Sequence, residues 1–296
     1  MFTKSSQSDP SSGEPVLLSA KPVILARTAA LVEKVKNFST CFGRVPKLAV
    51  VLVGNDPASL IYTTRKTEAC NRAGISHVTH QLTEESDPSR LKDLLDSLND
   101  DTSVDGILVQ RPLPNQFREK DVLMWVEPSK DVDAFHPQSV GSLTLGLPCF
   151  TPCTPGGIMT LLDHYQINYK NRVACVVGRS NIVGRPMAQL LIQNNATVIQ
   201  CHSKSLPLER FTREADILIV AAGRPHLINQ THVRPGAVVV DVGIHRTLDG
   251  KICGDVDFGE VSKIASAITP VPGGVGPMTI MTLLENTLLA ATRHQQ

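Results

Sequence analysis

The chain has 296 residues, of which 42% are hydrophobic and 19% charged, and its 29 basic and 28 acidic side chains leave a formal net charge of +1. This length suits one large domain or two ordinary ones. The balanced charge lacks the basic footprint of proteins that bind nucleic acid or anionic membranes. Apolar runs such as 217–222 are far shorter than the ~20 residues of a membrane-spanning helix. We therefore expect a soluble protein that binds neither nucleic acid nor a membrane.

The cysteines and the N-terminal segment point to an intracellular protein. Seven scattered cysteines form no C-x-x-C pair and have no histidine at zinc-finger spacing, which predicts reduced thiols and no metal site. The first residues are rich in Ser and Pro and lack the apolar stretch of a secretory signal. We therefore expect a disordered tail over 1–16 and a cytoplasmic protein.

From Lys47 onward, short runs of Val, Ile and Leu alternate with amphipathic stretches, as is typical of parallel strands joined by crossover helices. A strand over 48–54 leads into a helix that Asp56 caps, Pro57 begins and Gly74 closes. The same unit continues with a strand over 77–82, a helix over 89–98 and a strand over 104–110.

Pro and Gly crowd residues 111–157, which indicates a domain junction or a set of site loops. A second alternation follows, with strands over 173–178, 197–201, 216–223 and 237–243 and helices over 182–194 and 208–213. This pattern predicts a doubly wound, nucleotide-binding sheet. A Gly-rich loop then leads into one closing helix, so the fold class is α/β with two parallel sheets.

The first turn of the second unit indicates a dinucleotide site. Strand, turn and helix come in the order that aims backbone N–H groups at a phosphate. The glycines, Gly178 and Gly184, are spaced G-x5-G instead of G-x-G-x-x-G, and a βα turn with two convenient glycines is an equally good interpretation of these residues alone.

The end of the next strand favours NADP over NAD. An NAD-binding sheet usually places an acid there, about 20 residues on, for the ribose hydroxyls. Here Ser203 and Lys204 take that place, and Arg179 and Ser180 lie in the first turn. These groups would bind a 2′-phosphate that an acid would repel. A solvated loop arginine is the simpler alternative for Arg179.

Several segments together resemble the methylenetetrahydrofolate dehydrogenase/methenyltetrahydrofolate cyclohydrolase family, and they appear in the family's order over about 48–287. They are S-x-x-Y-x-x-x-K (Ser59, Tyr62, Lys66), GILVQRPLP (106–114), KDVDAFHP (130–137), FTPCTPGG (150–157), VVGRSNIVGRP (176–186) and ITPVPGGVGPMT (268–279).

The resemblance implies a bifunctional enzyme. It would oxidise 5,10-methylenetetrahydrofolate with NADP and hydrolyse the methenyl product to 10-formyltetrahydrofolate. The resemblance also implies a homodimer whose protomer has a folate cleft between two domains. The N-terminal catalytic domain would span 17–153 and be completed by a C-terminal helix over 279–296, and the Rossmann-like NADP-binding domain would span 154–278.

Four residues are expected to carry the folate chemistry. Tyr62 and Lys66 are four apart on a predicted helix, so they share a face, although such a pair alone is commonly a solvated surface. By resemblance, Lys66 is the catalytic lysine, which assists water attack and proton transfer, and Tyr62 stacks on the folate. Gln110 would orient the lysine, and Asp133 would accept from the N–H donors of the pterin.

Further residues complete the predicted site, and among them the resemblance assigns Thr154, Ile244 and Thr279 to the cofactor. Ser59 is a weaker candidate because serine near a helix start is commonly a cap. Cys153 is not expected to be a nucleophile. The remaining substrate-binding residues are Pro272, Gly273 and Gly276. The cofactor-binding residues are Thr154, Gly178, Arg179, Ser180, Ile182, Ser203, Ala222, Ile244 and Thr279.

Three residues depart from the family pattern on the folate side. Ala134 stands where Gly is usual, and if that position needs a positive φ, a β-carbon there costs about 1 kcal/mol and shifts Asp133 slightly. Ser139 stands where Asn is usual, and Arg111 replaces a common Leu.

Other functions remain as alternatives. A monofunctional dehydrogenase of the same family would lack hydrolysis. A different NADP-dependent oxidoreductase would need an acid or base in the cofactor domain, such as His202 or His245. A non-catalytic NADP sensor would not need the four folate-side residues.

Overall fold

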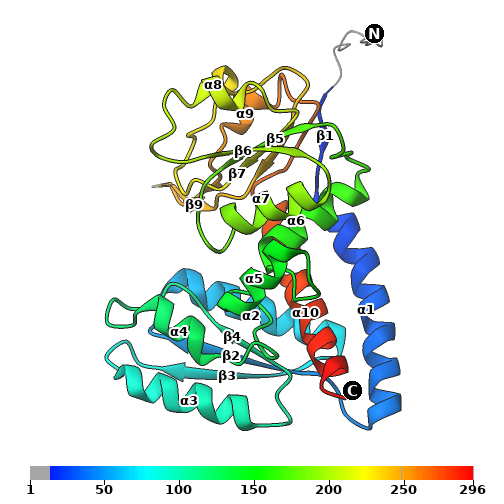
Figure 1. Ribbon diagram of the computed structural model, residues 1–296, viewed down its shortest axis with the longest axis vertical. Helices are drawn as coiled ribbons and strands as arrows, with labels where there is room; N and C mark the ends of the chain where they lie inside the picture. The colour runs from blue at the N-terminus through cyan, green and yellow to red at the C-terminus, as the bar shows by residue number, and fades with distance from the viewer. Residues whose placement is uncertain (1–13, 248, 296) are drawn as a thin grey trace.

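The computed structural model describes residues 14–247 and 249–295, which form two parallel α/β units connected by long helices (Figure 1). The first unit contains α1 (Ala20–Phe42), β2 (Lys47–Val53), α2 (Pro57–Ala73), β3 (Ser76–Leu82), α3 (Pro88–Asp100), β4 (Gly106–Val109), α4 (Glu119–Trp125) and α5 (Pro137–Leu145). The second contains β1 (Val16–Leu17), α6 (Cys153–His164), β5 (Val173–Val177), α7 (Gly184–Gln193), β6 (Thr197–Cys201), α8 (Glu209–Thr212), β7 (Ile217–Val220), η1 (Gln230–His232), β8 (Val238–Asp241), β9 (His245–Arg246), β10 (Ile252–Cys253), α9 (Phe258–Val261) and β11 (Ala267–Ile268). The closing helix α10 (Val275–Arg293) packs on both.

Local sequence signals set the bounds of α2. The Asp56 carboxylate accepts from Ser59 N at 2.8 Å, Pro57 takes the first helical position, and Gly74 ends the helix at a φ of 75°. A side-chain acceptor satisfies a backbone donor at the helix start, and glycine adopts a left-handed φ without strain. The predicted cap, first residue and end of this helix are confirmed.

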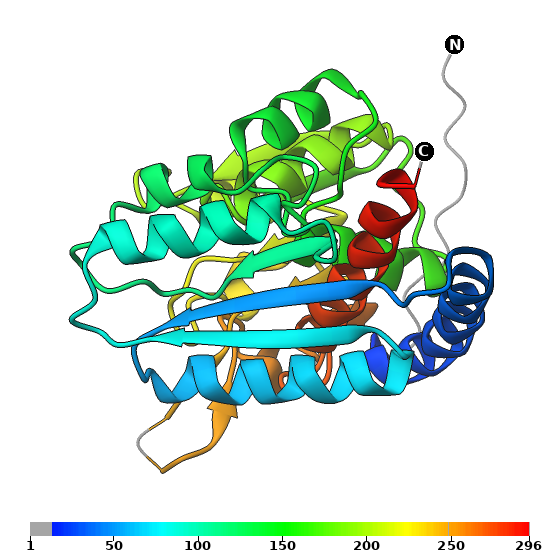
Figure 2. The ribbon, with the colours of Figure 1, turned by 90° about the horizontal axis from the view of Figure 1, so that it is seen from below.

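The first sheet has the parallel order β3-β2-β4, and both of its faces are covered (Figure 2). Successive residues of a strand point to opposite faces. Leu48 and Val50 of β2 join a core with α1, α2 and α10, whereas Ala49 and Val51 join a core with α3 and α4. This explains why β2 is apolar without interruption from Leu48 to Val53.

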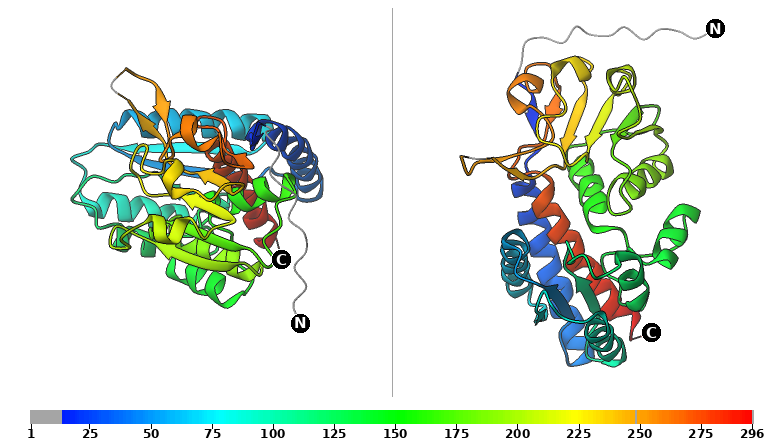
Figure 3. Two further views of the ribbon diagram at one scale, coloured as in Figure 1. Left: turned by 90° about the horizontal axis from the view of Figure 1, so that it is seen from above. Right: turned by 90° about the vertical axis from the view of Figure 1, so that its left-hand side faces the viewer.

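The second sheet has the order β1-β11-β8-β7-β5-β6, and every pairing in it is parallel. The predicted tail differs from the structure at its end, because Val16 pairs with Ala267 and extends this sheet. Residues 1–13 lie outside the described residues, so the rest of the tail prediction stays untested. The short hairpin of β9 and β10 projects beside the sheet (Figure 3).

Helices α1 and α10 run side by side from the edge of the second unit along the first unit (Figure 3). Arg27 Nε on α1 donates to Glu285 Oε1 on α10 at 2.7 Å. The predicted closing helix is present, whereas no prediction covered α1. Its buried Leu31, Val35 and Phe38 have the spacing of one helical face, so the signal existed in the sequence.

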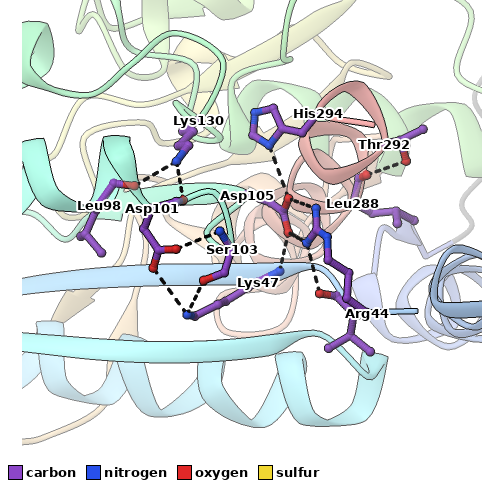
Figure 4. Close-up of polar contacts among 11 residues, drawn as sticks. Arg44, Lys47, Leu98, Asp101, Ser103, Asp105, Lys130, Leu288, Thr292 and His294 are labelled. Atoms are coloured by element: carbon purple, nitrogen blue, oxygen red, sulfur yellow. Dashed lines mark hydrogen bonds and ion pairs between the residues drawn. The ribbon is translucent and has the colours of Figure 1, made fainter. Parts of the chain in front are cut away.

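The end of α10 contacts the first sheet through Asp105, which directly precedes β4 (Figure 4). The Asp105 side chain is fully buried. Its carboxylate accepts two hydrogen bonds from the Arg44 guanidinium, each at 2.7 Å, and one from Lys47 N at 2.8 Å. His294 Nδ1 lies 3.4 Å from the same carboxylate. His294, which follows α10, is therefore linked through Asp105 to Lys47 at the start of β2.

Within the described residues 14–247 and 249–295, no helix combines the length and the apolar character needed to cross a bilayer.

Candidate active site

Helix α2 carries the predicted catalytic lysine on its buried face. Lys66 is 8% exposed, and Tyr62, one turn earlier, is half-buried. Lys66 Nζ donates to Gln110 Oε1 at 2.8 Å, just beyond the end of β4, and Gln110 Nε2 donates to Arg111 O at 2.7 Å. Because both ends of the Gln110 amide are engaged, the lysine is held at a defined place.

Asp133 lies in a loop that its neighbours hold tightly. Lys130 Nζ donates to three carbonyl oxygens at the end of α3, at 2.6 to 3.0 Å. The Asp131 carboxylate accepts from His136 N at 2.7 Å and from Ser139 Oγ at 3.1 Å. Ser139, a departure from the family pattern, is therefore part of the support of this loop.

Ala134 has a φ of 61° and closes a turn in which its N–H donates to Asp131 O at 3.0 Å. The structure therefore has the positive φ at this position that would make a β-carbon costly. An alanine there costs about 1 kcal/mol relative to a glycine in backbone strain.

Three ionisable side chains share the buried end of this site. Burial lowers the pKa of Lys66, while the nearby Asp133 charge opposes that change. Burial raises the pKa of Asp133, and Lys66 is the strongest opposing influence. Burial and the Asp133 charge raise the pKa of Cys153 well above its ordinary value. Cys153 is consequently a neutral thiol, in keeping with the expectation that it is not a nucleophile.

Arg111 lines the same region and supports two predicted residues. Its carbonyl oxygen accepts from Gln110 and lies 3.2 Å from Ser59 Oγ, which is also 2.8 Å from the Asp56 carboxylate. Its guanidinium lies 5.1 Å from the centre of the Phe135 ring. Ser59 is buried and engaged in these contacts, so the structure places it in the support of the site.

A cavity of about 660 Å³ lies at the carboxyl ends of β5, β6 and β7. This volume is in the range of small-molecule sites, and this sheet edge is where α/β folds bind ligands. Five of the predicted cofactor residues line it: Gly178, Arg179, Ser180, Ser203 and Ala222.

Both glycines of the G-x5-G turn are needed for close backbone approach. A β-carbon on Gly178, which has a φ of 138°, would lie 2.3 Å from Ala221 O. One on Gly184 would lie 2.3 Å from Gly178 O. Ser180 Oγ accepts from Val183 N at 3.1 Å and shapes the turn into α7.

The two units meet at Gly276. A β-carbon on this glycine would lie 3.7 Å from the Tyr62 hydroxyl and 3.5 Å from Ile244 Cδ1. Tyr62 belongs to the first unit and Ile244 follows β8 of the second. Helix α2, which carries Lys66, and the second sheet therefore border one shared region.

The other predicted residues lie around this junction. Thr154 Oγ1 and Thr279 Oγ1 are 3.0 Å apart at the starts of α6 and α10. Gly273 O accepts from Ala20 N at 2.9 Å, which fixes the Gly-rich loop to α1. Ile182 is partly exposed in the turn before α7, and Pro272 is exposed.

Sequence reasoning missed several residues that hold the site. Asn286 on α10 donates to Val132 O at 2.8 Å and Thr151 O at 2.9 Å, which joins the Asp133 loop to the segment before α6. Buried Asp241 and Asp255 organise the loops beside the cavity. The available signal for Asn286 was an amide side chain between the leucine pairs 283–284 and 288–289 of the predicted closing helix.

Comparison with known proteins gives a consistent result over both units. A model described as the tetrahydrofolate dehydrogenase/cyclohydrolase catalytic domain matches residues 18–133, and one described as the NAD(P)-binding domain of the same enzymes matches residues 152–295. The chain is 50% identical to "Bifunctional protein FolD" of Wolinella succinogenes over 280 residues, which cover 95% of this chain and 98% of the relative.

Solved structures of the same enzymes are similar to this chain over nearly its whole length. The bifunctional FolD enzyme, methylenetetrahydrofolate dehydrogenase/cyclohydrolase, from Campylobacter jejuni superposes with a TM-score of 0.92 at 48% identity, covering 94% of this chain and 99% of that one. The Trypanosoma brucei methylenetetrahydrofolate dehydrogenase-cyclohydrolase, solved with NADP cofactor and an inhibitor, gives 0.91 at 32% identity, covering 96% and 99%. The predicted α/β fold of two domains is confirmed.

Proposed function

The chain belongs to the tetrahydrofolate dehydrogenase/cyclohydrolase family, and from that premise we propose which of its residues carry out the family's two reactions. It is a bifunctional enzyme that oxidises 5,10-methylenetetrahydrofolate with NADP and hydrolyses the methenyl product to 10-formyltetrahydrofolate. The observation that carries the residue assignment is the placement of Lys66, held by Gln110, beside the region where the two units meet.

Lys66 is the catalytic group of hydrolysis. Burial lowers its pKa, which increases the fraction of neutral amine available to take a proton from an attacking water. Gln110 fixes the amine through the 2.8 Å hydrogen bond. Asp133 accepts from the amino and ring N–H donors of the pterin, and Tyr62 packs against the folate.

The oxidation depends mainly on position. Loss of hydride from the methylene carbon is assisted by the lone pair of the folate nitrogen, so no side chain must act as acid or base at that carbon. Tyr62 and Asp133 hold the folate, and Gly276 allows the backbone to approach it closely.

The residues present fit NADP. The cradle formed by Gly178 and Gly184 has no room for a β-carbon, and the turn of residues 178–180, which precedes α7, lines the cavity beside it. Arg179, Ser180 and Ser203 line this cavity, and Lys204 is adjacent; their cation and hydroxyl donors suit a 2′-phosphate. When bound, the cofactor supplies the hydride acceptor.

Replacing Lys66 with methionine tests the assignment. Lys66→Met removes the amine but keeps an apolar stem of similar length, so hydrolysis of pre-formed methenyltetrahydrofolate should fall by about 10²-fold or more. The NADP Kd, measured by calorimetry, should stay within about two-fold of wild type because Lys66 is outside the cofactor cavity. Wild-type hydrolysis in this variant contradicts the role of Lys66. If the unmodified protein oxidises methylenetetrahydrofolate but shows no hydrolysis above background, it is a monofunctional dehydrogenase.

We also propose a cytoplasmic homodimer. All seven cysteines are free thiols, as in proteins of reducing compartments. Strand β3 is an edge of the first sheet, and an edge strand offers unpaired backbone groups to a second chain. Light scattering of the purified chain distinguishes a dimer from a monomer.

A further inference from the structure

Two buried carboxylates beside the cofactor cavity have no part in the chemistry derived above. Asp241 ends β8 and is 4% exposed, and Asp255 follows β10 and is fully buried. Asp241 accepts from Gly243 N and Asp255 N, each at 2.9 Å, and from Val256 N at 3.0 Å. Asp241 therefore fixes the backbone that carries Asp255.

Asp255 in turn binds two separate segments. Its Oδ2 accepts from Ala222 N at 2.6 Å and Gly223 N at 3.0 Å, and its Oδ1 accepts from Arg224 N at 2.9 Å. The same Oδ1 lies 2.7 Å from His245 Nε2. Because a carboxylate only accepts, Nε2 carries the proton in this pair.

The two segments border the two ends of the cofactor site. Ala222 and Arg224 line the 660 Å³ cavity. His245 directly follows Ile244, whose Cδ1 reaches the junction at Gly276 opposite Tyr62. One carboxylate thus sets the position of a cavity wall and of the residue facing the folate side.

Glycine backbone packs closely against both buried carboxylates. A β-carbon on Gly243 would lie 2.5 Å from Asp255 Oδ1, and one on Gly254 would lie 1.8 Å from Asp241 Oδ2. His245, by contrast, retains 22% side-chain exposure. Of the groups that meet at Asp255, His245 is therefore the side chain that can be replaced with the least disturbance to the buried backbone.

We propose that His245 is a positioning residue for hydride transfer: by donating to Asp255, it holds Ile244 and the 222–224 turn in register across the cofactor site. This inference rests on the proposed function. It assigns His245 no proton-transfer role, and it predicts that the oxidation depends on this hydrogen bond whereas the hydrolysis does not. Hydrolysis uses Lys66 and Gln110, which lie in the other unit.

Two variants of His245 test the proposal. His245→Leu removes the donor and keeps an apolar side chain, whereas His245→Gln keeps an amide N–H that reaches a position similar to Nε2. His164→Leu is the matched control, because His164 is an exposed histidine at the end of α6. Each protein is assayed for oxidation of methylenetetrahydrofolate with NADP and, separately, for hydrolysis of pre-formed methenyltetrahydrofolate without cofactor.

The expected result is a split between the two activities. In His245→Leu, kcat/KM for oxidation falls at least about ten-fold, equivalent to about 1.4 kcal/mol, while hydrolysis stays within about two-fold. His245→Gln restores most of the oxidation, and the control changes neither activity. Equal loss of both activities, unchanged oxidation in His245→Leu, or failure of His245→Gln to restore it overturns the proposal, the last result indicating an acid–base role.

The proposed function and the role of His245 fail on different observations. The proposed function fails if the wild-type protein does not oxidise methylenetetrahydrofolate at all. In that case the NADP Kd decides the inference, since His245→Leu should weaken NADP binding at least about ten-fold relative to both wild type and His245→Gln. Equal affinity in the three proteins would then overturn the positioning role.

Discussion

At the scale of single residues, the ionisation of Lys66 is governed by two opposing influences. Burial disfavours the ammonium and lowers the pKa, while the Asp133 carboxylate favours the ammonium. Burial is the larger of the two, so the net change is downward. The neutral amine that we propose assists hydrolysis is therefore more abundant at moderate pH than that of an exposed lysine.

Removing the Asp133 charge should lower the pKa of Lys66 further. In Asp133→Asn the ammonium loses its carboxylate neighbour while burial persists, so the titration should move to lower pH. The measurement is the ¹³Cε chemical shift of Lys66 against pH in the free protein, assigned by its absence in Lys66→Met. A midpoint that stays in place or moves up contradicts the coupling between these residues.

Ala134 offers a second test at this scale. Ala134→Gly relieves about 1 kcal/mol of left-handed strain but removes a buried methyl group worth about 0.8 kcal/mol, so stability should change little. Ala134→Val adds a β-branched side chain at a φ of 61° and should cost about 2 kcal/mol or more. Urea unfolding of both variants is the measurement, and equal stabilities would show that the backbone is not constrained there.

At the scale of elements, α6 and α10 approach through Gly157. A β-carbon on Gly157 would lie 2.8 Å from the carbonyl carbon of Met278, so Gly157→Ala should push backbone apart and cost about 2 kcal/mol. Gly141 in α5 has no heavy atom within 4 Å of its β-carbon position. Gly141→Ala should therefore stabilise by about 0.5 kcal/mol. Thermal melts compare the two, and similar effects of both changes would contradict the close helix contact.

An element could be predicted when the residues that begin and end it lie within its own segment of the sequence. Helix α2 has its cap, its first proline and its final glycine within one segment, and its bounds followed from them. Val16 could not be placed, because its strand forms only through pairing with Ala267, far along the chain.

The same distinction applies to the site. Lys66 and Gln110 belong to motifs with family-wide spacing, and the structure brings them into contact. Asn286 acts on a carbonyl 154 positions away. Asp255 acts on a turn that only the folded sheet brings near it. Short motifs carry no information about such contacts.

At the scale of the whole molecule, the shared helices should couple the stability of the two units. Trp125 is the single tryptophan and ends α4 in the first unit, whereas the cavity that we propose for NADP lies in the second. NADP at about 100 times its Kd stabilises the folded state by about 2.7 kcal/mol, or about 5 °C in Tm for a chain of this size. Trp125 fluorescence should report that increase. A Trp125 transition that NADP leaves unmoved, beside a shifted second transition, would indicate independent unfolding.

Helix α10 also constrains the order in which the protein can be made. It begins at the Gly-rich loop, positions the Asp133 loop through Asn286, and is followed by His294 against Asp105. During translation the first sheet leaves the ribosome before this helix has been synthesised. Until α10 emerges, the core between the first sheet, α1 and α2 lacks the apolar side chains that α10 contributes. Only after α10 has left the ribosome can its apolar face complete that core.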